Sequence, residues 1–94
     1  MIWETLKEQR RLLRRPVGHI AVIKAEPRAP PHYCIVIDES DTGVRISIPH
    51  DFEPPDEFIL RRYSGEEGNY KVVWRNGRLI GARLVSRTMQ LGLL

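Results

Sequence analysis

The chain has 94 residues, of which 41% are hydrophobic and 29% charged, with a formal net charge of +3. This composition is typical of one small globular domain and excludes a disordered chain. No apolar run approaches the roughly 20 residues needed to cross a bilayer, and the N-terminus lacks the uninterrupted apolar core of a secretion signal. The single cysteine, Cys34, excludes an internal disulfide and suits a reducing compartment. We therefore expect a cytoplasmic protein without membrane insertion.

The N-terminal segment is predicted to form a short helix. Apolar residues such as Trp3 and Leu6 recur at helical spacing with charged residues between them, which favours an amphipathic helix over residues 3–13. Pro16 ends this helix, because the residue before a proline is pushed away from helical angles. We assign residues 1–15 to an N-terminal helix and an arginine-bearing arm at one end of the domain.

From Val17 onward, runs of β-branched and alternating apolar residues predict six strands. Asn76–Gly77 separates the last two runs and is a strong signal for a tight hairpin in which both turn residues have positive φ. Six short strands with little helix between them indicate an antiparallel barrel or sandwich, and a closed barrel leaves no unpaired edge. We expect the barrel to fill residues 16–86, with a tail or minimal helix over 87–94. The predicted strands span residues 17–25, 32–38, 44–48, 57–62, 70–75 and 78–85.

The residues that usually carry catalysis or bind metals are sparse. The three histidines, His19, His32 and His50, lie far apart in the sequence, and no Cys-x-x-Cys or His-x-x-x-His spacing occurs. His32 and Cys34 alternate along one predicted strand, an arrangement that packing alone explains. There is no Gly-x-Ser-x-Gly, phosphate-binding loop or Gly-x-Gly-x-x-Gly motif. We therefore expect neither an enzyme nor a bound metal or cofactor.

Four arginines gather just before the first predicted strand. Arg10, Arg11, Arg14 and Arg15 form two overlapping Arg-x-x-x-Arg pairs. A guanidinium group is planar and always charged, and it can bind phosphate or guanine O6 and N7 through two hydrogen bonds. On its own, such a cluster is equally typical of a helix C-terminus, where cations complement the helix dipole. The basic N-terminal segment and the acidic middle of the chain suggest an anionic ligand at one end, or a self-complementary surface.

A second segment, Asp38-Glu-Ser-Asp-Thr-Gly43, lies between two predicted strands. Taken alone it is a turn, in which Asp and Ser bond to the local backbone and Gly supplies positive φ. A functional interpretation is that Asp38 and Ser40 present acceptors to the N1–H and N2–H₂ groups of a guanine. Gly43 would then allow the backbone to approach a ligand closely.

In this order, Arg-x-x-x-Arg, a strand and Asp-x-Ser-x-x-Gly together resemble the signature of PilZ domains, which bind cyclic di-GMP. The likeness continues through Pro55–Leu60, Lys71–Arg75 and Ile80–Leu84, which are similar to the closing strands of the short, single-domain PilZ proteins common in alphaproteobacteria. It runs from about Arg10 to Val85. The resemblance implies a bacterial, PilZ-like six-stranded β-barrel that receives the second messenger cyclic di-GMP.

The resemblance also implies roles for individual residues. In PilZ domains the arginines contact phosphates and the Hoogsteen edge of guanine, while the Asp and Ser of the second motif contact the other guanine edge. The ligand is often bound as an intercalated dimer. The arginine pair falls best on Arg11 and Arg15, because this register leads directly into the first strand, and Arg10 and Arg14 form the alternative register. The implied ligand-binding residues are Arg10, Arg11, Arg14, Arg15, Asp38, Ser40 and Gly43.

Ligand binding is expected to change the conformation or association of the protein, and so to control a protein partner in motility, biofilm formation or polysaccharide export. We expect a monomer or a weak homodimer. One alternative is a degenerate PilZ adaptor that binds a protein partner without nucleotide. Another is a small barrel that binds RNA or single-stranded DNA, which needs aromatic stacking platforms in a basic groove. Aromatic residues total only 7% and the middle of the chain is acidic, so we expect no nucleic-acid polymer as a partner.

Overall fold

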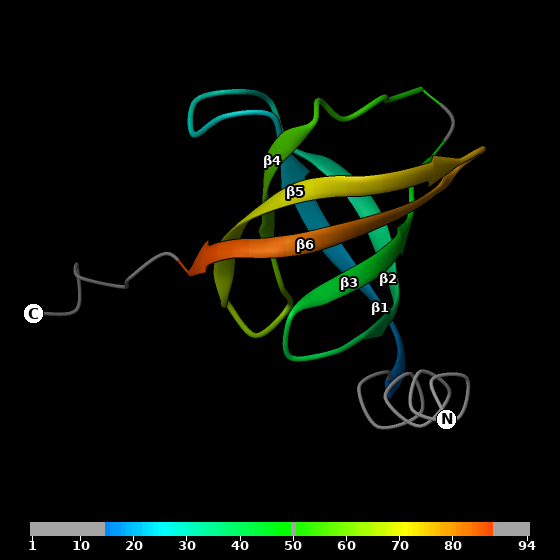
Figure 1. Cartoon of the computed structure of the whole chain (residues 1–94). Helices are drawn as coiled ribbons and strands as arrows, with labels where there is room; N and C mark the ends of the chain where they lie inside the picture. Colours follow the sequence, from blue (N-terminus) through cyan, green and yellow to red (C-terminus); the bar gives the residue numbers. More distant parts are fainter. Residues whose placement is uncertain (1–14, 50, 88–94) are drawn as a thin grey trace, which may run out of the picture.

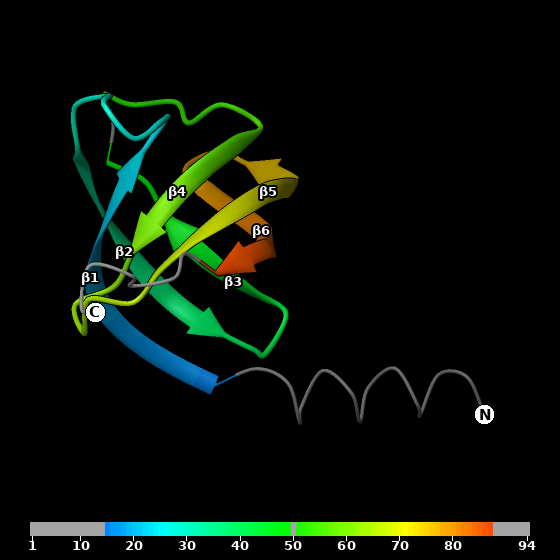
Figure 2. The same ribbon diagram turned by 90° about the vertical axis from the view of Figure 1, so that its left-hand side faces the viewer.

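The computed structural model describes residues 15–49 and 51–87. In this part of the chain six antiparallel strands form a closed barrel, in the order β1-β2-β3-β6-β5-β4 around its wall (Figure 1, Figure 2). The wall closes because β1 pairs with both β2 and β4. The strands are β1 (Arg15–Lys24), β2 (His32–Glu39), β3 (Gly43–Ser47), β4 (Glu57–Arg61), β5 (Glu67–Asn76) and β6 (Leu79–Arg87).

The core fills the interior of the barrel. Buried and more exposed positions alternate along β2 and β3, as expected for strands with one face toward a core. Phe58 and Tyr70 stack across β4 and β5 with ring centroids 6.1 Å apart. Burial of apolar surface is the dominant favourable force in so small a domain. The buried apolar residues are Ala21, Ile23, Cys34, Val36, Val44, Ile46, Ile48, Phe58, Leu60, Tyr70, Ile80 and Ala82.

The prediction of an all-β, six-stranded antiparallel barrel is confirmed, and each predicted strand corresponds to an observed one. Every strand differs from its predicted bounds at one end or both, mostly by one or two residues, and β5 begins three residues earlier than predicted. β1 begins at Arg15 and includes Pro16, which lies beside a register shift, where a strand tolerates a residue without a backbone N–H. β6 continues to Arg87. The helix predicted over residues 3–13 and the tail from residue 88 onward lie outside the described part of the chain.

The hairpin that joins β5 and β6 turns one residue later than predicted. Asn76 still pairs with Leu79, so the two turn residues are Gly77 and Arg78. Gly77 has a φ of 63°, whereas no other type of residue in the described part of the chain has positive φ. The prediction that both Asn76 and Gly77 have positive φ is therefore wrong. A positive φ at the first turn residue alone is the pattern of a type II′ turn, which also suits the twist of the paired strands.

The connections are divided between two ends of the barrel. One end, which we call the β2–β3 end, holds the start of β1, the β2–β3 and β4–β5 turns and the end of β6 (Figure 1). The opposite end holds the longer loops 25–31 and 48–56 and the β5–β6 turn. The described residues include no helix that is long and apolar enough to cross a membrane.

Candidate ligand-binding site

A break in register in β2 places Asp38 opposite Arg45 of β3. Val36 pairs with Ile46 and Asp38 pairs with Arg45, so Ile37 is an extra residue relative to β3. A bulge of this kind re-aims the side chains around it. Asp38 therefore faces Arg45, whose Nη2 donates a 2.7 Å hydrogen bond to Asp38 Oδ2. Only 7% of Asp38 is exposed, so its carboxylate is a nearly buried, ion-paired group.

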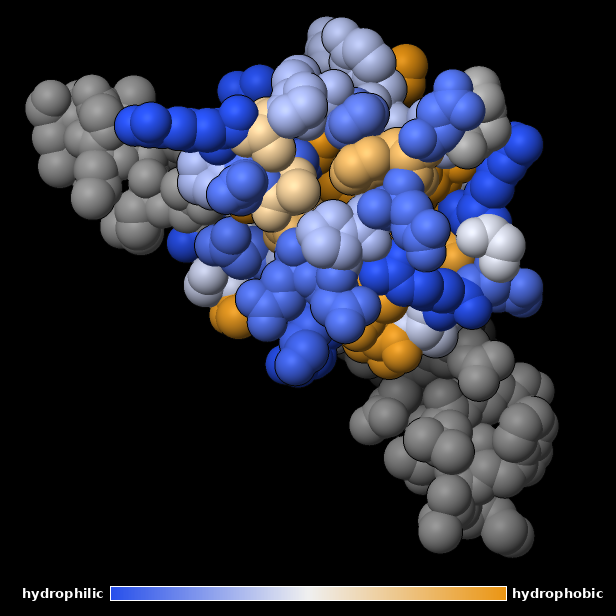
Figure 3. All heavy atoms as spheres, turned by 90° about the horizontal axis from the view of Figure 1, so that it is seen from above, coloured by the Kyte–Doolittle hydropathy of each residue, from blue (hydrophilic) through white to orange (hydrophobic). Residues whose placement is uncertain are grey.

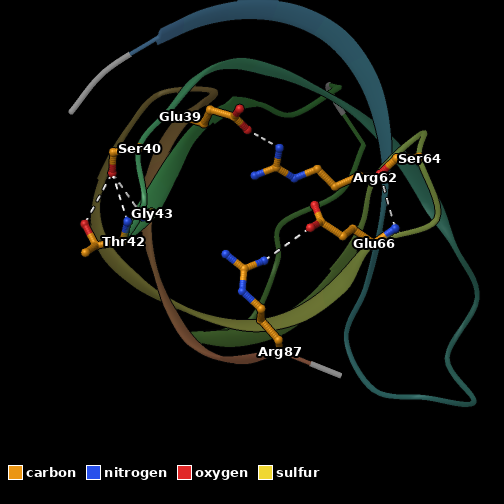
Figure 4. A network of polar contacts seen from close by, with 8 residues as sticks. All are labelled: Glu39, Ser40, Thr42, Gly43, Arg62, Ser64, Glu66 and Arg87. Atoms are coloured by element: carbon orange, nitrogen blue, oxygen red, sulfur yellow. Dashed lines mark hydrogen bonds and ion pairs between the residues drawn. The ribbon is translucent and has the colours of Figure 1, made fainter. Parts of the chain in front are cut away.

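The next residue, Glu39, turns inward. It pairs with the buried residue Val44, and its carboxylate accepts a hydrogen bond from the guanidinium of Arg62 across the mouth of the barrel (Figure 4). Burial by itself would lower the pKa of Arg62, but hydrogen bonds with Glu39 and Tyr70 outweigh it, and the pKa lies above its ordinary value. Arg62 is thus a fixed positive charge just inside the β2–β3 end.

Ser40 folds the β2–β3 turn onto itself. Its Oγ accepts hydrogen bonds from the backbone N–H groups of Thr42 and Gly43, both at 3.2 Å (Figure 4). The backbone N–H of Ser40 donates to the carbonyl oxygen of Gly43 at 2.9 Å. Such contacts are expected of a serine in a tight turn. Its contact with a guanine stays a prediction.

Gly43 lies where β3 passes very close to β6. A Cβ atom at this position would collide with the carbonyl oxygen of Ala82. A second contact joins the β2–β3 turn to β6: the Leu84 N–H donates a 2.7 Å hydrogen bond to the carbonyl oxygen of Thr42. The sequence predicts a close backbone approach at Gly43, and the structure shows one to the backbone of β6. An approach to a ligand stays a prediction.

A shallow hollow of about 210 Å³ lies beside this turn, over β3, β5 and β6. The indole of Trp74 covers Gly81, its partner in the ladder, so closely that a Cβ atom at Gly81 would collide with it. Trp74 nevertheless keeps 36% of its surface exposed. The hollow therefore combines an aromatic ring, two hydroxyl groups and the cation of Arg83. It is lined by Ser40, Thr42, Gly43, Val44, Val73, Trp74, Gly81, Ala82 and Arg83.

The start of β1 lies next to the same turn. In the β1–β2 ladder, the backbone of Arg15 is paired with Glu39, one residue before Ser40. Antiparallel pairing therefore brings the end of the arginine cluster to the segment that carries the second motif. The side chains of the cluster lie outside what the structure describes; they are those of Arg10, Arg11, Arg14 and Arg15.

The opposite end of the barrel carries a larger hollow, of about 380 Å³, between residues 49–54 and the β5–β6 turn. Arg75 Nη2 donates a 2.8 Å hydrogen bond to the carbonyl oxygen of Pro54, which fastens this loop to β5. Seen from this end, the surface is largely hydrophilic, with hydrophobic residues in separate patches (Figure 3). None of the predicted site residues in the described part of the chain lines this hollow. Among residues 15–49 and 51–87 there is also no group of three or more His, Cys, Asp or Glu suited to a metal ion.

A search of the sequence against models of known protein families finds no match, and a search of curated proteins finds none either. The PilZ resemblance therefore depends on the residues of the chain itself.

Three residues near the candidate site were not predicted as parts of it: Arg45, Arg62 and Trp74. The alternation around Arg45 indicates an outward side chain, but its contact with Asp38 depends on the bulge in β2, which no local pattern reveals. Arg62 follows β4 and meets Glu39 only because the barrel closes. Trp74 offered a usable signal, since a large aromatic residue next to a predicted hairpin turn is a candidate ligand contact.

Proposed function

We propose that the protein is a cyclic di-GMP-binding signal receiver of the PilZ type, without enzymatic activity of its own. The observation that carries this proposal is the pairing of Arg15 with Glu39 in the β1–β2 ladder. Through it, the backbone of Arg15, the last residue of the arginine cluster, lies beside a turn rich in oxygen acceptors at one end of the barrel. The ligand has matching chemistry, because it carries anionic phosphates and guanine bases.

Each part of the proposed site suits a different part of the ligand. Arginine side chains bind phosphates through charge-assisted hydrogen bonds and can pair with the Hoogsteen edge of guanine. Carboxylate and hydroxyl oxygens accept hydrogen bonds from the N1–H and N2–H₂ groups of guanine. In the ligand-bound state Asp38 would share its carboxylate between guanine and Arg45, its partner in the structure. The exposed indole of Trp74 supplies a surface on which a base can stack.

Binding would act as a signal by changing how the N-terminal arm is held. Phosphate contacts supply affinity, while contacts with the guanine edge supply base specificity. A ligand shifts a conformational equilibrium by as much as its affinities for the two states differ. A ligand held between arm and barrel makes contacts that exist only when the two are close. The closed form is then what a protein partner, or a second copy of the chain, recognises.

Isothermal titration calorimetry of the purified protein with cyclic di-GMP tests the proposal, with GTP and cyclic di-AMP as controls. We expect saturable binding of cyclic di-GMP alone, and its stoichiometry gives the number of ligand molecules in the site. Arg15→Ala is expected to abolish this binding while leaving the midpoint of thermal unfolding nearly unchanged. Arg28→Ala, in the exposed loop at the opposite end, is the matched control and should bind normally. A large loss of thermal stability in Arg15→Ala would make Arg15 structural and contradict its proposed role.

A degenerate PilZ adaptor is the second candidate function. One observation favours it: the two carboxylates before the turn, those of Asp38 and Glu39, are already engaged by Arg45 and Arg62. A ligand would therefore have to compete with, or share, contacts that the barrel makes internally. A folded protein that gives no heat with cyclic di-GMP at two temperatures would support the adaptor.

A further inference from the structure

Both ladders of β2 are irregular just before its last two residues, although Asp38 and Glu39 themselves pair with β1 and β3. On one side, the β1–β2 register shifts between Pro16 and His19; on the other, the β2–β3 register shifts between Val36 and Asp38. Both ladders thus break at the level of Ile37. A register shift leaves residues out of the regular hydrogen-bond pattern. Side-chain contacts after these two breaks add to the backbone pairing that holds Asp38 and Glu39.

Glu39 is well placed to provide such a contact. It directly follows Asp38, directly precedes Ser40, and points into the mouth of the barrel toward Arg62 (Figure 4). The side chains of Glu39 and Arg62 are only 17% and 16% exposed. Because water screens a covered ion pair weakly, this contact is stronger and more directional than an ion pair on the surface.

Backbone hydrogen bonds in the β4–β5 turn hold Arg62 in place. Its backbone N–H donates a 2.7 Å hydrogen bond to the carbonyl oxygen of Glu66, and its carbonyl oxygen accepts one of 2.9 Å from the N–H of Gly65. The nearby side chain of Tyr70, a residue of the core, also helps to raise the pKa of Arg62. Arg62 is therefore a fixed point from which the end of β2 can be positioned, although β2 and β4 are not neighbours in the sheet.

We propose that Arg62 is a positioning residue for the ligand site: by holding Glu39 inside the barrel, it fixes Asp38 opposite Arg45 and Ser40 at the start of the turn. This inference rests on the proposed function for its consequence on binding, but its structural part does not require a ligand. The second ion pair at the same mouth, between Glu66 and Arg87, has no such role. Its atoms lie 3.5 Å apart, its side chains are 62% and 60% exposed, and neither residue adjoins the Asp38–Gly43 segment.

Amide hydrogen exchange in the ligand-free protein tests the structural part. The reporters are the N–H groups of Thr42 and Gly43, which donate to Ser40 Oγ. The reference is the Ala29 N–H, which donates to the carbonyl oxygen of Glu26 at the opposite end. In Arg62→Leu we expect exchange at Thr42 and Gly43 to rise about tenfold, the loss expected of one charge-assisted hydrogen bond. Exchange at Ala29 should stay as in the wild type.

Two further variants separate positioning from general stability. Arg87→Leu removes the exposed ion pair at the same mouth and should leave exchange at Thr42 and Gly43 unchanged. Glu39→Gln keeps the shape of the side chain but weakens the hydrogen bond with Arg62, and it serves as the test if Arg62→Leu does not fold. A rise in exchange shared equally with Ala29, or no rise in either variant of the Glu39–Arg62 pair, would overturn the inference.

Calorimetry with cyclic di-GMP then tests the consequence for binding. We expect the affinity to fall about tenfold in Arg62→Leu and to stay unchanged in Arg87→Leu. If the wild-type protein does not bind the ligand, the proposed function fails, while the local change in exchange still supports the positioning role. If the wild type binds and Arg62→Leu binds equally well, the positioning role fails and the proposed function stands.

Discussion

At the scale of single residues, glycines set how closely the strands and side chains around the candidate site approach one another. Gly43 lets β3 pass against the carbonyl oxygen of Ala82, and Gly81 makes room for the indole of Trp74. Both positions line the same hollow. The shape of this surface therefore depends on two positions where glycine has no side chain as much as on the side chains that line it.

Gly43→Ala is expected to destabilise the protein. The added methyl group would meet a backbone oxygen, which can move only if β3 and β6 separate, and overpacking of this kind typically costs about 1–3 kcal/mol. The free energy of unfolding measured in urea should fall by this amount. Asp41→Ala, an exposed change in the same turn, is the control and should have little effect. Equal stability of wild type and Gly43→Ala would show that the turn relaxes more easily than the contact implies.

Trp74→Ala is expected to weaken the binding of cyclic di-GMP without preventing it. Stacking of a base on an aromatic side chain contributes about 1–3 kcal/mol, so the dissociation constant should rise roughly 5- to 150-fold. Quenching of indole fluorescence on titration of a Trp3→Phe variant, in which Trp74 is the remaining indole, would report the same contact. Tyr63→Ala removes an aromatic residue that is 92% exposed and does not line the hollow. Similar losses in both variants would mean that Trp74 has no special role.

At the scale of elements, ion pairs add contacts between segments to those made by the backbone ladders. Glu39, at the end of β2, contacts Arg62, which directly follows β4. Arg75 of β5 contacts Asp56, which directly precedes β4, at 3.2 Å. These contacts differ in exposure, because Asp56 is 84% exposed whereas the Glu39–Arg62 pair is largely covered. Exposed ion pairs contribute little to stability, whereas breaking a covered pair is costly.

A pair of double-mutant cycles measures this difference. For Glu39→Gln and Arg62→Gln we expect a coupling free energy of about 1–3 kcal/mol, because the two charges are shielded from water. For Glu66→Gln and Arg87→Gln, whose side chains are mostly exposed, we expect at most about 0.5 kcal/mol. Unfolding in urea at low salt gives both values. A larger coupling for the exposed pair would contradict the view that burial decides these contacts.

The sequence predicted the elements better than the contacts between them. Alternation and turn residues identified all six strands, because a two-residue period and a glycine-containing turn are local properties. The turn at Gly77 was placed one residue too early, since an Asn-Gly pair does not fix which two residues close the hairpin. The contact of Asp38 with Arg45 was missed because it depends on a register break between two strands. Long-range pairs such as Glu39 and Arg62 come from closure of the barrel, which no local pattern contains.

At the scale of the whole molecule, one interior serves all six strands, and Cys34 lies within it with 1% of its surface exposed. Burial raises the pKa of its thiol to about 12, from an ordinary value of 9.0. A thiol that stays protonated is a poor nucleophile. In the native protein we therefore expect Cys34 to react with thiol reagents only when the barrel opens.

The same burial predicts how stability depends on pH. Between pH 9 and 12 the thiol of the unfolded chain ionises while that of the folded chain stays protonated, so ionisation favours the unfolded state. The protonated thiol therefore makes its full contribution to the free energy of unfolding below pH 9. This contribution is lost as the pH rises toward 12, by at most about 1.4 kcal/mol per pH unit. We expect the free energy of unfolding, measured in urea over this pH range, to fall less steeply in Cys34→Ala than in the wild type. Parallel curves would mean that the thiol ionises equally in both states.

The division of the connections between two ends of the barrel also has a practical consequence. The start of β1, the Asp38–Gly43 turn and the Glu39–Arg62 pair all lie at one end, while the loop of residues 25–31 lies at the other. Exposed loops rich in small and polar residues are the usual sites at which a protein accepts an inserted domain. A fluorescent reporter placed in the 25–31 loop would be carried by the barrel without touching the proposed ligand site. The fold therefore offers a ready scaffold for a genetically encoded sensor of whatever small molecule the β2–β3 end recognises.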